Sequence, residues 1–114
     1  MDGGGLHTAA GMLTAMEQSL RVRPVYRVTN SRGTGLFAAK WKLDGFRVAT
    51  GGLPYGVLAY RISGTAPVIR RANGQSRRTC PPIGSVSFAS ADVRAEWSSE
   101  GRCEALHVYI DPDM

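Results

Sequence analysis

Cysteine and histidine are both scarce in this sequence, which has two of each among its 114 residues. Cys80 and Cys103 lack CxxC spacing and are too few for a disulfide scaffold, so we expect two reduced thiols, with a single bridge as the alternative. With only His7 and His107, the sequence offers little material for a histidine-rich metal or catalytic centre.

Long hydrophobic runs are missing as well. The uncharged stretch Val48–Tyr60 has only 13 residues and is interrupted by Gly51, Gly52 and Pro54, whereas a membrane-spanning helix needs about 20 apolar residues. The chain opens Met-Asp-Gly-Gly-Gly, with an acidic residue where a signal peptide has basic ones. We therefore expect neither a membrane span nor a secretory signal, and a cytoplasmic location.

Length and composition limit the classes of protein to which this chain can belong. A chain of 114 residues, 43% of them apolar, can form one domain around a single core, which excludes a multidomain enzyme and a largely disordered chain. Lysine and arginine number 14 against 9 acids, a net charge of +5 that is compatible with a polyanionic partner. The only cationic clusters, Arg70-Arg71 and Arg77-Arg78, flank a predicted turn at residues 72–76, so we expect them to form a solvated rim.

The first 20 residues differ from the rest. After three glycines, the segment Thr8–Leu20 has apolar residues at helical spacing, namely Met12, Leu13, Met16 and Leu20. We predict a flexible arm or a short helix over residues 1–20, and one domain over residues 21–114.

From Val25 onward, short apolar stretches alternate with turn signals. The predicted strands are Val25–Thr29, Phe37–Leu43, Phe46–Thr50, Val57–Ser63, Pro67–Arg71, Arg77–Cys80, Ser85–Ala89, Val93–Trp97 and Glu104–Ile110. Strands at this spacing are typical of an all-β sandwich or barrel. In the last strand one face is apolar and the other carries aromatic and polar side chains. This suits a barrel wall with one side packed and the other facing a cavity. One face carries Leu106, Val108 and Ile110, and the other carries Ala105, His107 and Tyr109.

An ordered set of short motifs in the second half of the chain supports a more specific interpretation. It consists of Leu58–Gly64, Arg70-Arg71 with Gly74, Pro81–Phe88, Glu96-Trp97 and Leu106–Pro112. In this order, these motifs resemble the N-terminal cupin-like effector-binding domain of AraC-type transcriptional regulators. The resemblance implies a jelly-roll barrel or double-stranded β-sandwich that binds a small-molecule effector and forms a homodimer.

Regulators of this family continue into a helix-turn-helix domain. The sequence contains no helix-turn-helix pattern, so we expect it to contact DNA only through a domain that lies outside it.

Enzymatic cupins bind a divalent metal, and the resemblance allows the same motifs to be sought in this sequence. When the second cupin motif is laid on Gly84, the ligand histidine falls at Ala95; when the first motif is laid on Gly64, the ligand glutamate falls at Val57. We therefore expect no metal and no cofactor. By the same resemblance, the effector would contact Trp97, His107 and Tyr109, with Tyr60 added if its strand faces inward; the alternative is that these are ordinary core residues.

Catalytic constellations are equally sparse. There is no Gly-x-Ser-x-Gly elbow and no Walker A loop. Cys103 and His107, four positions apart on one strand, would lie about 13 Å apart, too far for a hydrogen-bonded dyad. The acids Asp92, Glu96, Glu100 and Glu104 surround a predicted hairpin and suit its solvated end.

We therefore expect a protein that is not an enzyme, although two other functions stay open. One is a metal-free isomerase or lyase that relies on His107. The other is a small basic β-barrel that binds single-stranded nucleic acid. Its base-stacking residues would be Trp41, Phe46, Tyr55 and Tyr60.

Overall fold

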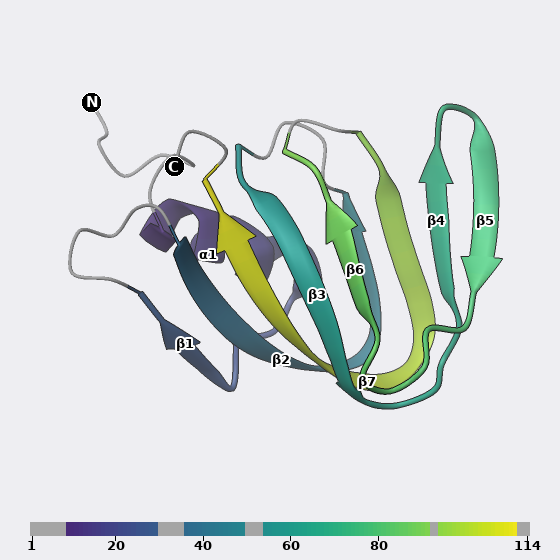
Figure 1. Cartoon of the computed structure of the whole chain (residues 1–114), viewed down its shortest axis with the longest axis horizontal. Coiled ribbons are helices and arrows are strands. Elements are labelled where there is room, and N and C mark those ends of the chain that lie inside the picture. The colour runs from purple at the N-terminus through teal and green to yellow at the C-terminus, as the bar shows by residue number, and fades with distance from the viewer. Residues whose placement is uncertain (1–8, 30–35, 50–53, 92–93, 112–114) are drawn as a thin grey trace.

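The computed structural model describes residues 9–29, 36–49, 54–91 and 94–111, and within these ranges the chain forms one helix and seven strands (Figure 1). The elements are α1 (Ala9–Leu20), β1 (Tyr26–Val28), β2 (Leu36–Ala49), β3 (Gly56–Ser63), β4 (Val68–Ala72), β5 (Gln75–Thr79), β6 (Val86–Ala89) and β7 (Glu96–Ile110).

All strand pairs are antiparallel and belong to one strongly bent sheet. Its order is β1-β2-β7-β3-β6, and the β4–β5 hairpin adds to the first part of β7. The two long strands β2 and β7 stay paired along their whole length and turn back together, so that the sheet forms a cup with two facing layers. Figure 1 shows this bend of β7 at the bottom of the view, between its arm beside β3 and its arm beside β4.

The bend has a local cause in the backbone. Asp44 pairs with Arg102, whereas the next pair is Phe46 with Ser99, so one residue of β2 opposes two residues of β7. Gly45 takes a φ of +77°, a conformation that side chains with a Cβ rarely adopt. The extra residue of β7 opposite Gly45 makes a β-bulge, which bends a strand pair without ending it.

This bulge corrects the sequence-based strand assignment. The predicted strands Phe37–Leu43 and Phe46–Thr50 are both parts of β2, because Asp44-Gly45 bends the strand instead of ending it. Likewise, Glu104–Ile110 and the end of the predicted strand Val93–Trp97 both belong to β7. Glu96 and Glu104 therefore lie on one continuous strand and do not flank a hairpin; Asp92 lies outside the described residues.

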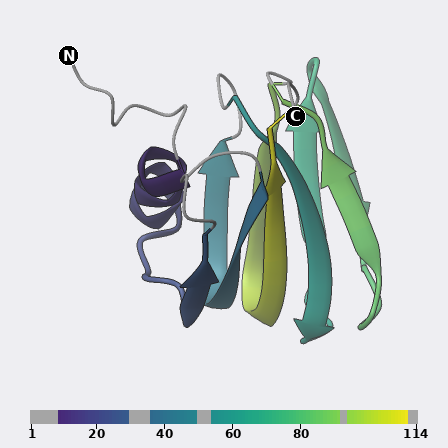
Figure 2. The same ribbon diagram turned by 60° about the vertical axis from the view of Figure 1, so that its left-hand side comes forward.

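The N-terminal helix α1 packs against β2 and contributes to the main hydrophobic core. Its four apolar residues at helical spacing are all buried: Met12, Leu13, Met16 and Leu20. The helix ends after Leu20, where Arg21 takes a left-handed conformation and donates its amide hydrogen to the carbonyl of Glu17 (2.8 Å). Figure 2 shows α1 beside β2. Of the two alternatives for residues 1–20, the described part is a helix that packs on the sheet.

The hairpin β4–β5 has the turn that the sequence predicts. Asn73 and Gly74 both have positive φ values (53° and 73°), as a two-residue type I′ turn requires. Every residue of β5 is exposed, so Arg77 and Arg78 lie in solvent. Arg70 differs because its guanidinium lies over the ring of Trp97, 5.4 Å from the ring centroid.

Two further expectations concern cysteines and membranes. Both cysteines are free thiols in the structure, Cys80 exposed and Cys103 buried. In the ranges that the structure describes, no helix is long and apolar enough to cross a membrane.

Candidate ligand cavity

A cavity of about 180 Å³ lies inside the cup, between its two layers. Its apolar wall comes from α1 and β2, with residues such as Met16, Leu20, Leu43 and Val48. An apolar cavity of about 150 Å³ is large enough for one benzene molecule, whereas drug-sized ligands occupy about 300–1,000 Å³. The cavity is therefore suited to a molecule the size of a single ring.

Two of the predicted site residues, Trp97 and His107, line this cavity from the two arms of β7. His107 lies on the arm that pairs with β3, opposite Ala59, and Trp97 lies on the arm that pairs with β4, opposite Arg70. The bend of β7 thus brings residues ten positions apart to one cavity. Whether they contact a ligand stays a prediction.

The third predicted residue, Tyr109, is fully buried beside the cavity and holds His107 in place. The Trp41 Nε1–H donates a hydrogen bond to the Tyr109 hydroxyl oxygen (2.9 Å), and that hydroxyl lies 3.0 Å from His107 Nδ1. The Tyr109 ring also stacks on Phe37, with ring centroids 4.9 Å apart. Tyr109 therefore acts as a buried link between two side chains.

The tautomer of the His107 imidazole sets the direction of its bond to Tyr109. With the ring hydrogen on Nε2, Nδ1 accepts from the Tyr109 hydroxyl. With the ring hydrogen on Nδ1, the imidazole donates to the Tyr109 oxygen, which has a second lone pair beside the one that accepts from Trp41. Burial lowers the pKa of His107 to about 4, so the ring is neutral at pH 7. At that pH the His107 ring carries one N–H donor and no charge.

The fourth predicted residue, Tyr60, does not point inward. It borders the cavity, but alternation along β3 places its side chain on the face opposite Ala59 and Arg61, where it is 39% exposed. The condition attached to Tyr60, that its side chain faces inward, is not met.

Trp97, a residue of the cavity wall, has an unpaired donor. Its Nε1 atom is buried and has no hydrogen-bond partner among the described residues. An unpaired N–H of this kind costs about 1–3 kcal/mol, and most buried donors in proteins have a partner.

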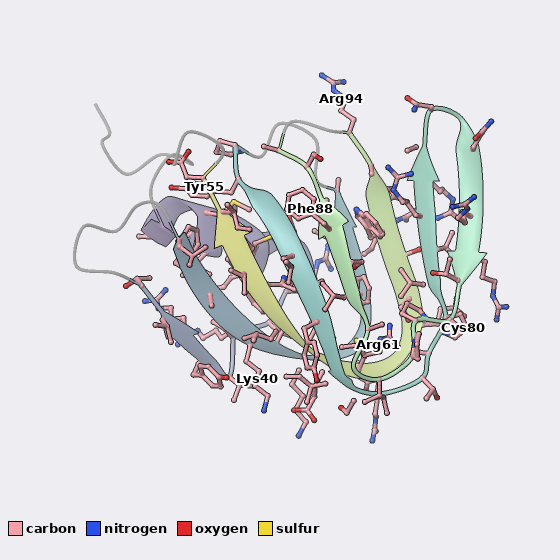
Figure 3. The ribbon with its side chains drawn as sticks, in the orientation of Figure 1. Lys40, Tyr55, Arg61, Cys80, Phe88 and Arg94 are labelled. Carbon is pink, nitrogen blue, oxygen red and sulfur yellow. The ribbon has the colours of Figure 1, made fainter. Side chains whose placement is uncertain are left out.

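Arg61 is the functional candidate that the sequence analysis missed. It lines the cavity and is only 8% exposed. Its Nη1 donates to the carbonyl oxygens of Gly64 (3.1 Å) and Ala66 (3.0 Å), which fix the guanidinium at the end of β3. Figure 3 shows Arg61 near the bend of β7, at the opposite end of the cup from Arg94. The available signal was the alternation of β3, which puts this arginine on the same face as Ala59.

The cavity does not fit a divalent metal ion. Its only metal-ligating side chains are Cys103 and His107, and no acidic side chain lines it in the described part of the chain. Nor do three His, Cys, Asp or Glu side chains gather anywhere among the described residues. Burial raises the pKa of the Cys103 thiol, which disfavours the thiolate that metals bind. The guanidinium of Arg61 would also repel a cation.

The aromatic residues considered for base stacking do not form one surface. Trp41 and Tyr55 are buried (0% and 3% exposed), and the ring of Tyr55 packs edge-on against Phe37 at 5.0 Å. Phe46 is partly buried against the core. Only Tyr60 is exposed among the four, so this set cannot supply a stacking platform.

A second feature of interest is the outer face of the layer formed by β1, β3, β6 and the arms of β2 and β7 that pair with them, which we call the first layer. The residues of this outer face alternate with those of the core, and two rows of them cross five strands in register. One row is Val28, Ala38, Val108, Leu58 and Phe88, and the other is Tyr26, Lys40, Leu106, Tyr60 and Val86. Several are well exposed, including Val28 (60%), Val86 (56%) and Phe88 (55%). We call these ten residues the outer apolar face.

Comparisons with solved structures agree on the architecture. The chain is similar to the cupin domain of Cnp3 from Schizosaccharomyces pombe (TM-score 0.58, 6% identity, covering 77% of this chain and 64% of that one). It is also similar to a cupin domain from Bordetella pertussis (TM-score 0.56, 10% identity, 75% and 91%). A third neighbour is the EutQ protein of Salmonella typhimurium LT2 (TM-score 0.55, 19% identity, 74% and 64%).

These likenesses define the class of the protein by its fold: the chain has a cupin fold. No protein-family model matches the sequence, and no curated protein is similar to it. The chain spans 64% of the length of the Salmonella EutQ protein. At such low identities the neighbours assign the fold and no activity.

Proposed function

We propose that this chain is a non-enzymatic sensor domain that binds a small-molecule effector inside its cup, as in AraC-type transcriptional regulators. The observation that carries the proposal is the ring-sized cavity lined by His107 and by Trp97, whose buried Nε1 has no partner among the described residues. Buried donors without acceptors are a feature of binding sites, since a ligand can supply the missing acceptor. The AraC assignment within the cupin class is supported by the ordered motifs from Leu58 to Pro112.

Binding without catalysis fits the chemistry of the cavity. General acid–base work needs a group whose pKa lies near the working pH. His107, with its pKa near 4, is a weak base at pH 7, and its Nδ1 is engaged by Tyr109. The described lining contains no carboxylate to act with it.

Dimerisation through the outer apolar face is part of the proposal, with a second copy of this chain as the occupant. A continuous exposed apolar surface of this kind marks a protein contact site. The one charged residue of this face is paired within the chain, because Lys40 lies 3.4 Å from Glu104, and Ser63 donates to the same carboxylate. Two identical faces can therefore meet without burying Lys40 as an unpaired charge.

A thermal-shift screen tests the effector proposal. We expect at least one class of small sugar, aromatic or aliphatic metabolite to raise the melting temperature, since a ligand at 100 times its dissociation constant stabilises the folded state by about 2.7 kcal/mol. The shift should disappear in Trp97→Ala or His107→Ala, and persist in the control Ser76→Ala, which lies on exposed β5. A cooperative melt with no shift from any compound contradicts the proposal.

Sedimentation of the purified chain tests the dimer. Phe88→Lys and Val28→Lys should shift the sedimentation coefficient from dimer to monomer, because each buries a charge in the contact. The control Ser76→Lys changes an exposed residue of β5, outside the outer apolar face, and should leave the dimer intact. A wild-type monomer at high concentration contradicts this part of the proposal.

A metal-free cupin enzyme is the second candidate, favoured by one observation: His107 is a titratable group in a cavity and is bonded to Tyr109. Turnover of an isomerase or lyase substrate in the presence of a chelator, lost in His107→Gln, would support the enzyme over the sensor.

A further inference from the structure

We propose that the ligand of the cavity is a small carboxylic acid with an apolar body about the size of one ring, whose carboxylate binds Arg61. This inference rests on the proposed function and names the chemical class of its effector. It is based on the charge and the hydrogen-bond donors of the cavity wall.

The first argument is that the buried charge of Arg61 has no counter-charge in the described part of the chain. None of the ion pairs found among the described residues involves Arg61. Buried charges in proteins are normally paired, because removing an ion from water is costly. The two carbonyl oxygens that accept from Nη1 orient the guanidinium, but they do not neutralise it. An anionic ligand would neutralise the charge of the guanidinium.

The second argument is that the polar side chains of the cavity wall provide mostly donors. Arg61, Trp97 and His107 can each donate an N–H, and the wall also has the hydroxyl groups of Thr79, Ser85 and Ser87. Acidic side chains are absent from the described lining. A site with this composition favours a ligand with hydrogen-bond acceptors and a negative charge, and disfavours amines and metal cations.

The third argument concerns the placement of the donors. Arg61 on β3 pairs with Ala105, and His107 is the next residue of β7 that faces inward, so the two side chains are diagonal neighbours. Trp97 approaches from the other layer of the cup. The Trp97 side chain thus lines the same cavity as Arg61, and its buried Nε1 has no partner among the described residues. A carboxylate has two oxygens and about four acceptor positions, enough to accept from several donors at once.

The size and the apolar part of the wall restrict the rest of the ligand. The cavity volume of about 180 Å³ is close to that of one ring. Phe46, Val48 and Val57 contribute to the wall and suit an aliphatic or aromatic body. A phosphate ester would need more charge compensation than one guanidinium provides, so a monocarboxylate is the better match.

The test is calorimetric titration of the full chain with matched pairs of probes: benzoate against benzamide, and cyclohexanecarboxylate against cyclohexanecarboxamide. We expect the acids to bind at least tenfold more tightly than the amides. Trp97→Phe keeps an aromatic ring but loses the N–H, and should weaken acid binding on the order of tenfold while leaving amide binding less affected. Inorganic phosphate should not compete with the acids.

Variants of Arg61 complete the design. Arg61→Met should abolish the preference for acids over amides, whereas Arg94→Met, an exposed arginine at the other end of the cup, should not. If Arg61→Met does not fold, Arg61→Lys retains the charge without the fork of donors and should lower acid affinity severalfold. Equal binding of acids and amides, or loss of acid binding in Arg94→Met alone, would overturn the inference but leave the sensor proposal in place. Failure of every ring-sized probe and metabolite to bind would overturn both.

Discussion

The two faces of the first layer carry side chains of similar hydrophobicity and yet have opposite environments. On the inner face of β2, Phe37, Trp41 and Leu43 are at most 5% exposed. On the outer face, Leu36 of the same strand is 48% exposed and Phe88 of β6 is 55% exposed. The inner face is covered by α1 and the second layer, whereas no element in the described ranges covers the outer one. Hydrophobicity alone therefore does not identify the core of this chain. The core is identified by which face is covered by elements that lie far away in the sequence.

The largest expected difference in stability between the two faces comes from replacing one aromatic residue on each face with alanine. Trp41→Ala should lower the free energy of unfolding by about 3–5 kcal/mol, because it opens a cavity in a fully buried site and leaves the Tyr109 hydroxyl without its donor. Phe88→Ala should cost less than about 1 kcal/mol in the monomer. Urea unfolding at low protein concentration measures both. Equal costs would mean that the outer face is covered within one chain.

The pH dependence of stability probes the inner face through His107. Its pKa is lowered from 6.5 to about 4 by burial, so between these values the unfolded chain binds a proton that the folded chain does not. The free energy of unfolding should therefore fall as the pH falls from about 7 to about 4, by up to about 3 kcal/mol from this group.

Urea unfolding of wild type and of His107→Gln at pH 7, 5.5 and 4 measures that contribution, since the variant retains the pH dependence of every other group. Parallel curves for the two proteins would show that His107 is not buried in the neutral form.

The close packing between the end of β3 and β7 is tested at Gly64, the residue that follows β3. This residue has a φ of +89°, and a Cβ there would collide with the carbonyl oxygen of Arg102 and the backbone of Cys103. Gly64→Ala should cost about 2–3 kcal/mol from strain and overlap together. Gly84→Ala is the matched control. Gly84 also has a positive φ (86°), but apart from its two chain neighbours no described residue has an atom within 4 Å of the position that its Cβ would take, so this change should cost about 1 kcal/mol. Thermal melting compares the two, and equal losses would contradict the overlap.

The smallest expected difference in stability is between two valine-to-threonine substitutions, one on each face. Val48→Thr places a hydroxyl on the inner face, where Val48 is 8% exposed, and should cost about 1–2 kcal/mol. Val86→Thr places the same hydroxyl on the outer face, at a residue that is 56% exposed, and should change stability by less than about 0.5 kcal/mol. If Val86→Thr proves as costly in a dilute sample, the outer face is not open to solvent.

Much of the local structure was predictable from short-range patterns. The spacing of Met12, Leu13, Met16 and Leu20 indicated the buried stripe of α1, and Asn73-Gly74 indicated the turn of the β4–β5 hairpin. The pattern failed at Asp44-Gly45, which is typical of a strand end. Gly45 instead lies opposite a bulge of β7. Whether a strand bends or stops depends on its partner strand, which here lies more than 50 residues away in the sequence.

The candidate site was predictable in part. Trp97 and His107, which the family resemblance named as ligand contacts, both line the cavity, and their contact with a ligand stays a prediction. On β3 the side chain of Tyr60 points to the outer face, and its neighbour Arg61 is the one that is enclosed. Tyr60 and Arg61 are adjacent in β3 and therefore lie on opposite faces of the sheet. Alternation shows which residues share a face, but not which of the two faces is covered.

The sequence by itself determined the strand content, the helical stripe, the type I′ turn and the sorting of each strand into two faces, because these depend on conformational preferences and on periods of two or 3.6 residues. Only the tertiary structure decided that β2 and β7 bend together, that Arg61 is enclosed without an acidic neighbour in the described chain, and that Trp97 and His107 meet at one cavity. The reason is physical: burial and pairing are set by contacts between residues distant in the chain, and the packing of the two layers selects which of two similar faces becomes the core.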